Sequence, residues 1–158
     1  KKPYKPTEDF EAVINHMRAW DEVGGLNRAL IIFPSHDDSP KTQERLVERL
    51  KLALPDCVRI SHLTPEFGTE EGRRLRAAGF VHDDDYDHYD HNHLLITTPH
   101  FSQEEAEKAR LDIQIAYYTS DEYGQHVQRK LKRFPYLKEC FRHSFDILFH
   151  HSGGRIKS

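Results

Sequence analysis

Cysteines and long apolar runs are scarce in this sequence, and their scarcity excludes several classes of protein. Cys57 and Cys140 are the two cysteines among 158 residues, so the chain has neither a disulfide framework nor a cysteine-rich metal site. Their apolar surroundings predict reduced, buried thiols, as in a cytoplasmic protein. The longest apolar runs, such as Ala29–Phe33, are far too short to span a bilayer. We therefore expect a cytoplasmic protein without a membrane partner.

Motifs of several common enzyme classes are also absent. The sequence has no Walker glycine loop, no G-x-G-x-x-G, no G-x-S-x-G and no H-E-x-x-H. Those motifs cradle phosphates, present a serine nucleophile or hold a catalytic zinc ion. Nucleotide binding and serine hydrolysis therefore receive little support.

What the sequence does contain fits one globular domain. Its composition of 37% hydrophobic and 31% charged residues allows a core without covalent staples, and we expect residues 1–158 to form a single domain. The net charge of −3 argues against indiscriminate binding of nucleic acid. This charge is uneven, because residues 83–90 contain five aspartates whereas basic side chains gather near the C-terminus.

Hydrophobic periodicity and helix caps predict the order of secondary structure. Apolar residues at helical spacing follow capping residues such as Thr7, Ser39 and Ser102. Short apolar runs bounded by proline or by polar turns predict strands instead. The expected helices cover about 8–22, 40–54, 66–79, 102–118, 119–134 and 136–149, with 145–149 open to a strand, and the expected strands cover 29–34, 57–63 and 91–98.

This order of elements is compatible with two arrangements. Our prediction is an α+β fold with a single, mostly antiparallel sheet of three to five strands and flanking helices. The alternative is an α/β fold with parallel βαβ units, because helices separate the strands along the chain. The periodicity alone does not distinguish the two.

A pair of histidines is the most informative motif. His91 and His93 stand at the head of an apolar strand, where alternate side chains share one face, so both can bind one divalent metal ion. Imidazole and carboxylate ligands suit metals such as Mn and Zn. The alternative is that both histidines are hydrogen-bonded surface residues beside a solvated acidic loop. The ligand that completes the metal site is expected from Glu66, His62 or an aspartate of residues 83–90.

Tyrosines and basic residues follow the histidines along the chain. A phenol can attack a phosphodiester that a metal ion polarises. Tyr118 lies off the apolar stripe of its helix and Tyr136 lies in a basic segment, so these two are the candidate nucleophiles. Tyr117 and Tyr123 fall on apolar stripes, which indicates core positions. Phosphate contacts are expected from Arg129, Lys130, Lys132, Arg133 and Lys138, with a solvated helix face as the equal alternative.

The histidine segment resembles that of the HUH endonucleases, which include rolling-circle replication initiators, relaxases and small transposases. Residues 91–95, HNHLL, are similar to the histidine–hydrophobe–histidine strand of that family, with Asn92 in place of the hydrophobe. Residues 60–66, ISHLTPE, are similar to its upstream strand with a glutamate. The resemblance covers residues 57–136. It implies an antiparallel sheet, a Mg or Mn ion on the histidines, and a tyrosine that attacks single-stranded DNA and leaves a 5′-phosphotyrosine.

Three functions follow from these patterns. The first is a metal-dependent endonuclease that nicks single-stranded DNA with a tyrosine nucleophile, as in replication initiation or mobilisation, with Mn, Mg or Zn as cofactor. The second is a metal-dependent hydrolase, such as a phosphoesterase, in which metal-bound water attacks. Its ligands would be His91, His93 and aspartates such as Asp87 or Asp90. The third is a non-enzymatic interaction domain with a histidine-rich metal site.

Overall fold

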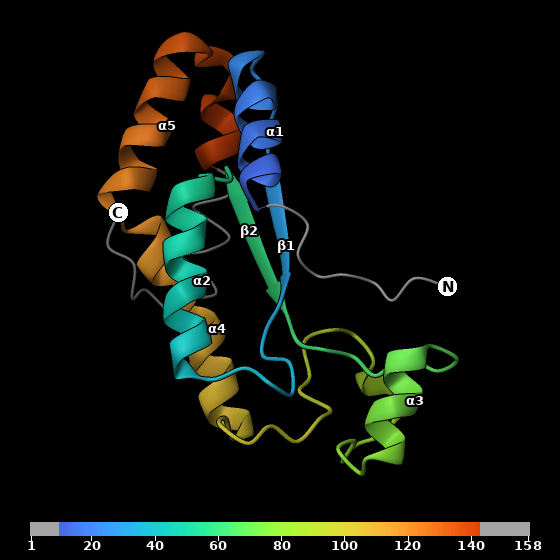
Figure 1. The fold of residues 1–158 in the computed structure, drawn as a ribbon. Coiled ribbons are helices and arrows are strands. Elements are labelled where there is room, and N and C mark those ends of the chain that lie inside the picture. The colour runs from blue at the N-terminus through green and yellow to red at the C-terminus, as the bar shows by residue number, and fades with distance from the viewer. Residues whose placement is uncertain (1–9, 143–158) are drawn as a thin grey trace. The chain divides into compact units, whose positions relative to one another are not determined.

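A computed structural model describes residues 10–142 (Figure 1). Residues 138–142 are helical, and the rest of the last predicted helix, with the alternative strand at 145–149, lies outside the described residues. The elements in chain order are α1 (Phe10–Glu22), β1 (Arg28–Ile32), α2 (Pro40–Ala53), β2 (Cys57–Ser61), α3 (Glu70–Ala77), the 3₁₀ turn η1 (Tyr86–His88), α4 (Gln103–Tyr118), α5 (Asp121–Arg133) and the 3₁₀ turn η2 (Pro135–Leu137).

The predicted antiparallel sheet of three to five strands is wrong. Residues 10–142 are mostly helical, at 56%, and contain one sheet of two parallel strands, β1 and β2. The two strands lie side by side in Figure 1, and α2 connects them along the chain. A parallel pair needs such a crossover, because a tight turn can join only antiparallel strands.

The third predicted strand, 91–98, is also wrong. Residues 94–96 are buried, as an apolar run should be. Within residues 10–142, however, they take part in a single isolated antiparallel bridge, between Ile96 and Val81. His91 has a φ of +63°, and the Asp90 carboxylate accepts hydrogen bonds from the amides two and three residues later. The backbone therefore turns where the strand was expected to begin.

The chain forms two compact units whose segments alternate along the sequence. Of the described residues, unit 1 comprises 10–29, 48–57 and 117–142, and unit 2 comprises 30–47 and 58–116. The single domain stays a prediction. The buried hydrophobic residues of unit 1 include Leu50, Tyr117, Tyr118, Tyr123, Leu137 and Phe141, and those of unit 2 include Phe33, Val58, Ile60, Leu75, Leu94, Leu95, Ile96, Phe101, Ala106, Ala109 and Ile113.

The cysteines depart from the prediction that both are buried. Cys57 is half-buried and Cys140 is exposed. Cys140 belongs to the helical residues 138–142, in which its neighbour Phe141 is the buried side chain. The apolar neighbourhood in sequence therefore did not place Cys140 on the inner face. Within the described part of the chain, no helix combines the length and apolarity needed to cross a membrane.

Two helical glycines provide a matched test of backbone packing. A β-carbon on Gly72 in α3 would lie 2.2 Å from the carbonyl oxygen of Glu66, whereas one on Gly124 in α5 would meet nothing within 4 Å. We expect Gly72→Ala to destabilise the protein by about 1–3 kcal/mol, because the backbone must shift. Gly124→Ala should stabilise it by about 0.5–1 kcal/mol through helix propensity. Urea denaturation measures both, and equal stability of the two variants would contradict the close approach at Gly72.

Candidate functional site

The histidines of the predicted metal pair lie in unit 2 but turn to different partners. His91 Nδ1 lies 2.9 Å from Thr64 Oγ1, and His91 Nε2 lies 3.9 Å from Glu66 Oε1. His93 Nδ1 lies 3.0 Å from Asp90 Oδ1 instead. The structure therefore brings Glu66 to His91. Among residues 10–142, no group of three ligand atoms within 4.8 Å includes His88, His91 or His93.

His62, the other predicted ligand, is fully buried in unit 2. Its Nδ1 lies 3.1 Å from the carbonyl oxygen of Phe33, and its Nε2 lies 3.1 Å from Glu107 Oε1. Burial lowers the pKa of His62 and outweighs the opposing hydrogen bond to Glu107. Both ring nitrogens thus have partners, and metal binding by His62 requires the loss of one of them.

The two candidate nucleophiles lie in unit 1 and differ in access. Tyr118 is buried in an aromatic cluster with Tyr117 and Tyr123, whose ring centroids lie 5.2 and 4.9 Å from its own. Tyr117 and Tyr123 are in the core, as predicted, and burial raises the pKa of both phenols. Tyr136 is 69% exposed. Of the two candidates, Tyr136 is the phenol that solvent reaches.

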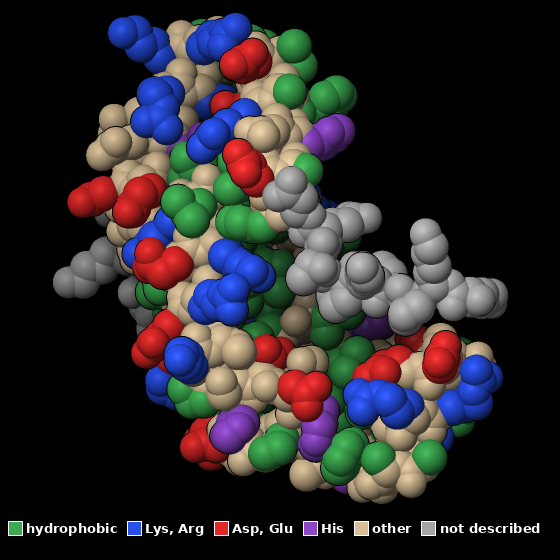
Figure 2. All heavy atoms as spheres, viewed as in Figure 1, with side chains coloured by type: hydrophobic (Ala, Val, Ile, Leu, Met, Phe, Trp, Pro, Cys, Tyr) green, Lys and Arg blue, Asp and Glu red, His purple; other side chains and the backbone are tan. Residues whose placement is uncertain are grey.

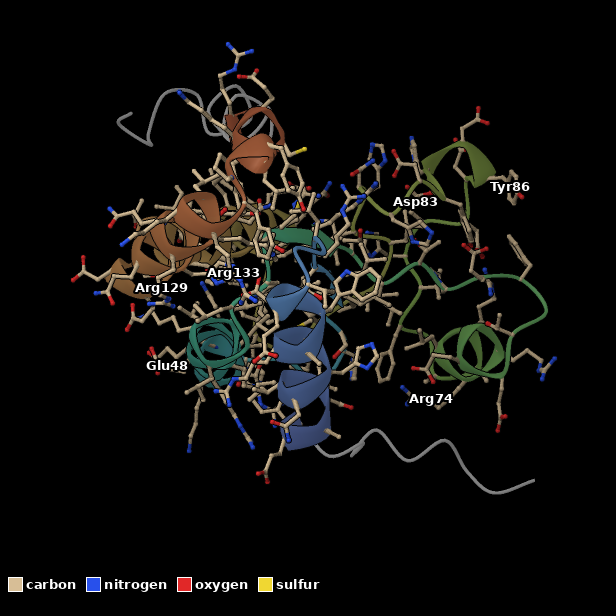
Figure 3. All side chains as sticks on the ribbon, turned by 90° about the horizontal axis from the view of Figure 1, so that it is seen from above. Glu48, Arg74, Asp83, Tyr86, Arg129 and Arg133 are labelled. Carbon is tan, nitrogen blue, oxygen red and sulfur yellow. The ribbon has the colours of Figure 1, made fainter. Side chains whose placement is uncertain are left out.

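The basic residues that were predicted to contact nucleic acid also differ in exposure. Arg129, Lys132, Arg133 and Lys138 are exposed, whereas Lys130 is buried. Figure 3 shows Arg129 extending outward from α5. On the face in Figure 2, basic and acidic side chains are interspersed over the helices of the upper part. This mixture favours the alternative of a solvated helix face.

Lys130 belongs to a buried ionic network in unit 1 that sequence reasoning missed. Its Nζ lies 2.6 Å from Asp56 Oδ2 and 2.5 Å from Asp21 Oδ1, and it donates a hydrogen bond of 2.7 Å to the carbonyl oxygen of Gly25. The contact with Asp21 is an ion pair and lacks the alignment of a hydrogen bond. His126 Nε2 lies 2.9 Å from Asp56 Oδ1. The ammonium group thus stands between two carboxylates.

The charges of this network fit a structural role. Burial by itself raises the pKa of Asp56, but hydrogen bonds from His126, Lys130 and the backbone amide of Asn27 together bring it below 3.8. Ligand atoms of Asp21, Asp56 and His126 lie within 4.8 Å of one another. The Lys130 ammonium already supplies the positive charge that a metal would bring there. The sequence signal was the interruption of the buried stripe of α5 by His126 and Lys130, at three and seven residues after Tyr123.

A different histidine pair lies on the loop formed by residues 82–93 in unit 2. The ring centroids of His88 and His93 are 4.7 Å apart. His88 Nδ1 lies 2.7 Å from Asp83 Oδ2, and His93 Nδ1 lies 3.0 Å from Asp90 Oδ1. Because a carboxylate holds each Nδ1, Nε2 is the nitrogen that each ring presents to a metal ion.

Aspartates at alternate positions explain how this loop folds locally. Asp83 accepts a hydrogen bond from the amide of Asp85, and Asp85 accepts one from the amide of Asp87 at the start of η1. Such turns are typical of aspartate, whose carboxylate satisfies the amide two residues later. Backbone hydrogen bonds lower the pKa of Asp83 and of Asp90, and the hydrogen bond to Asp83 raises the pKa of His88. The loop therefore holds charged carboxylates against imidazoles.

Comparison with known proteins adds no relative to this geometry. No family model matches the chain, and no curated protein sequence matches it. The resemblance of residues 57–136 to the HUH endonucleases stays a prediction, and the sheet that it implied is not found in residues 10–142.

Proposed function

We propose that this chain is an interaction domain with a divalent metal site, to which His88 and His93 supply two of the ligands. The observation that carries the proposal is the pair of imidazole rings 4.7 Å apart, each with a carboxylate on Nδ1. A carboxylate in that position fixes the ring and makes Nε2 a better ligand. Imidazole donors suit Zn²⁺ better than Mg²⁺, which prefers oxygen ligands. Zn²⁺ is therefore the ion we propose.

The surroundings of the pair favour binding over catalysis. The side chains of His88 and His93 are 41% and 48% exposed on a surface loop. Tyrosine chemistry gains no support from Tyr118, because its side chain is buried. The nicking of single-stranded DNA stays a prediction.

Hydrolysis by metal-bound water is the second candidate, and one observation favours it. Unit 2 contains a cavity of about 390 Å³, a volume typical of small-molecule sites. Its lining includes Leu94, which directly follows His93, together with His82 and His100. Neither His88 nor His93 lines this cavity, so an ion on His93 would have to supply the nucleophilic water to a substrate that extends beyond it.

Calorimetric titration with Zn²⁺ tests the proposed site. We expect the wild-type protein to bind Zn²⁺ and the His88→Ala/His93→Ala variant to lose about a hundredfold or more in affinity, since both imidazole ligands are removed. His91→Ala is the matched control, because His91 faces Thr64 and Glu66, and its affinity should equal that of the wild type. A loss in His91→Ala as large as in the double variant would favour the pair predicted from the sequence.

The same proteins separate the three functions. Turnover of a phosphodiester by the zinc-loaded wild type, abolished in the double variant, would favour the hydrolase. A covalent adduct with single-stranded DNA that disappears in Tyr136→Phe would favour the nicking enzyme. Zinc binding without either activity is the result that we expect.

A further inference from the structure

Three aromatic rings stack beside the acidic loop of unit 2, and two of them, Phe67 and Tyr86, are exposed. The ring centroids of Phe67 and Tyr89 are 5.2 Å apart, with planes at 12°, and those of Tyr86 and Tyr89 are 5.6 Å apart, with planes at 22°. Phe67 is 55% exposed and Tyr86 is 72% exposed. Figure 3 shows Tyr86 projecting outward from its loop. Large rings gathered in solvent mark a binding surface more often than isolated apolar residues do.

Carboxylates surround this stack. Asp84 accepts a hydrogen bond of 2.9 Å from the hydroxyl of Tyr89, and Asp85 and Asp87 flank Tyr86 in the sequence with exposed side chains. The face of an aromatic ring is itself negative, so rings and carboxylates together attract cations. The same charges repel phosphates, which excludes nucleic acid as the partner of this surface.

The protein's own Arg76 already uses one part of the surface. Its guanidinium carbon lies 4.0 Å from the centroid of the Phe67 ring, and its Nε donates a hydrogen bond of 3.2 Å to Asp84. A guanidinium group is thus held between an aromatic face and a carboxylate. Within residues 10–142, Asp85 and Asp87 form no ion pair with a lysine or arginine, so the half of the surface around Tyr86 has no such cation.

We propose that Phe67, Tyr86 and Tyr89, with Asp84, Asp85 and Asp87, form a docking surface for an arginine-rich segment of a partner protein. The inference rests on the proposed function because it takes the chain to be an interaction domain. To that function it adds the class of partner. Arginine fits better than lysine, because a planar guanidinium stacks on a ring while it pairs with a carboxylate. The occupant follows from charge complementarity and from the contact that Arg76 makes on Phe67.

Fluorescence anisotropy with labelled peptides tests the docking surface. An arginine–glycine peptide should bind saturably and more tightly than the same peptide with lysine, and a glutamate–glycine peptide should not bind. Tyr86→Ala is expected to weaken the arginine peptide about two- to fivefold, the usual contribution of an exposed cation–π contact. Asp85→Asn/Asp87→Asn should weaken it by a similar factor or more. Tyr136→Ala, which removes an equally exposed tyrosine from unit 1, should leave it unchanged.

Two results would overturn this inference. One is the absence of saturable binding of the arginine peptide. The other is equal binding of arginine and lysine peptides that Tyr86→Ala does not change, because that pattern indicates attraction to the acidic loop alone. The His88→Ala/His93→Ala variant separates this test from that of the metal site, since it should lose Zn²⁺ and keep the peptide. Zinc binding without peptide binding would contradict the docking surface only.

Discussion

Lys130→Met is expected to destabilise the protein by about 3–5 kcal/mol, the largest effect among the substitutions that the structure suggests. The methionine leaves the carboxylate of Asp56, which is 3% exposed, without its ammonium partner. The remaining hydrogen-bond partners of this carboxylate in residues 10–142 are His126 and the amide of Asn27. A buried charge that loses its counter-ion bears the full cost of desolvation. The free energy of unfolding, measured with urea, gives the effect.

Two further variants show that the loss comes from the unpaired charge. Arg133→Met removes an exposed cation from the same helix and should change stability by no more than about 0.5 kcal/mol. Lys130→Met/Asp56→Asn removes both charges and should recover part of the stability that Lys130→Met loses. A Lys130→Met protein as stable as the Arg133→Met protein would show that the network does not hold unit 1 together.

Zinc affinity is expected to rise steeply with pH across the range in which His88 loses its proton. A metal ion binds the neutral imidazole, so a proton on His88 competes with it. The hydrogen bond to Asp83 raises the pKa of His88 above 6.5. Below that raised pKa, affinity should fall about tenfold for each pH unit and each histidine that must be deprotonated, and above it affinity should level off. Calorimetric titration at a series of pH values measures the profile.

Asp83→Asn provides the control for this pH dependence. Without the carboxylate, the pKa of His88 should move down toward 6.5, so the affinity should level off at a lower pH. The plateau affinity should also be about 10–100-fold weaker, because the partner that orients the ring is lost. An affinity that does not depend on pH in the wild type would show that His88 is not a ligand.

The helices were the part of the fold that local sequence determined well. The capping box predicted at Ser102 forms, with Glu105 Oε2 2.8 Å from the amide of Ser102 and Ser102 Oγ 3.2 Å from the amide of Glu105. The next cap falls one residue later than Thr119, because Ser120 caps α5 through the amide of Tyr123. Caps and periodicity act within a few residues, so a single sequence reveals them.

Pairing between distant residues was not predictable in this way. The apolar residues 94–96 indicated burial, but whether a buried run joins a ladder depends on a partner strand elsewhere in the chain. Lys130 was assigned to the surface because lysines usually lie there, and its partner Asp56 is 74 residues away. At the histidine cluster, the sequence indicated metal chemistry, but the turn at Asp90 decided that His93 approaches His88 and that His91 faces Thr64.

The alternation of the two units along the chain has a consequence for biosynthesis. Every segment of unit 2 lies between segments of unit 1, and its last residue is Ala116. A ribosome therefore synthesises all of unit 2 before it makes Lys130. Until α5 emerges, the carboxylate of Asp56 has no ammonium partner and the first segments of unit 1 must stay open. The last segment of unit 2 thus leaves the ribosome before α5 does, and unit 1 closes only after α5 has emerged.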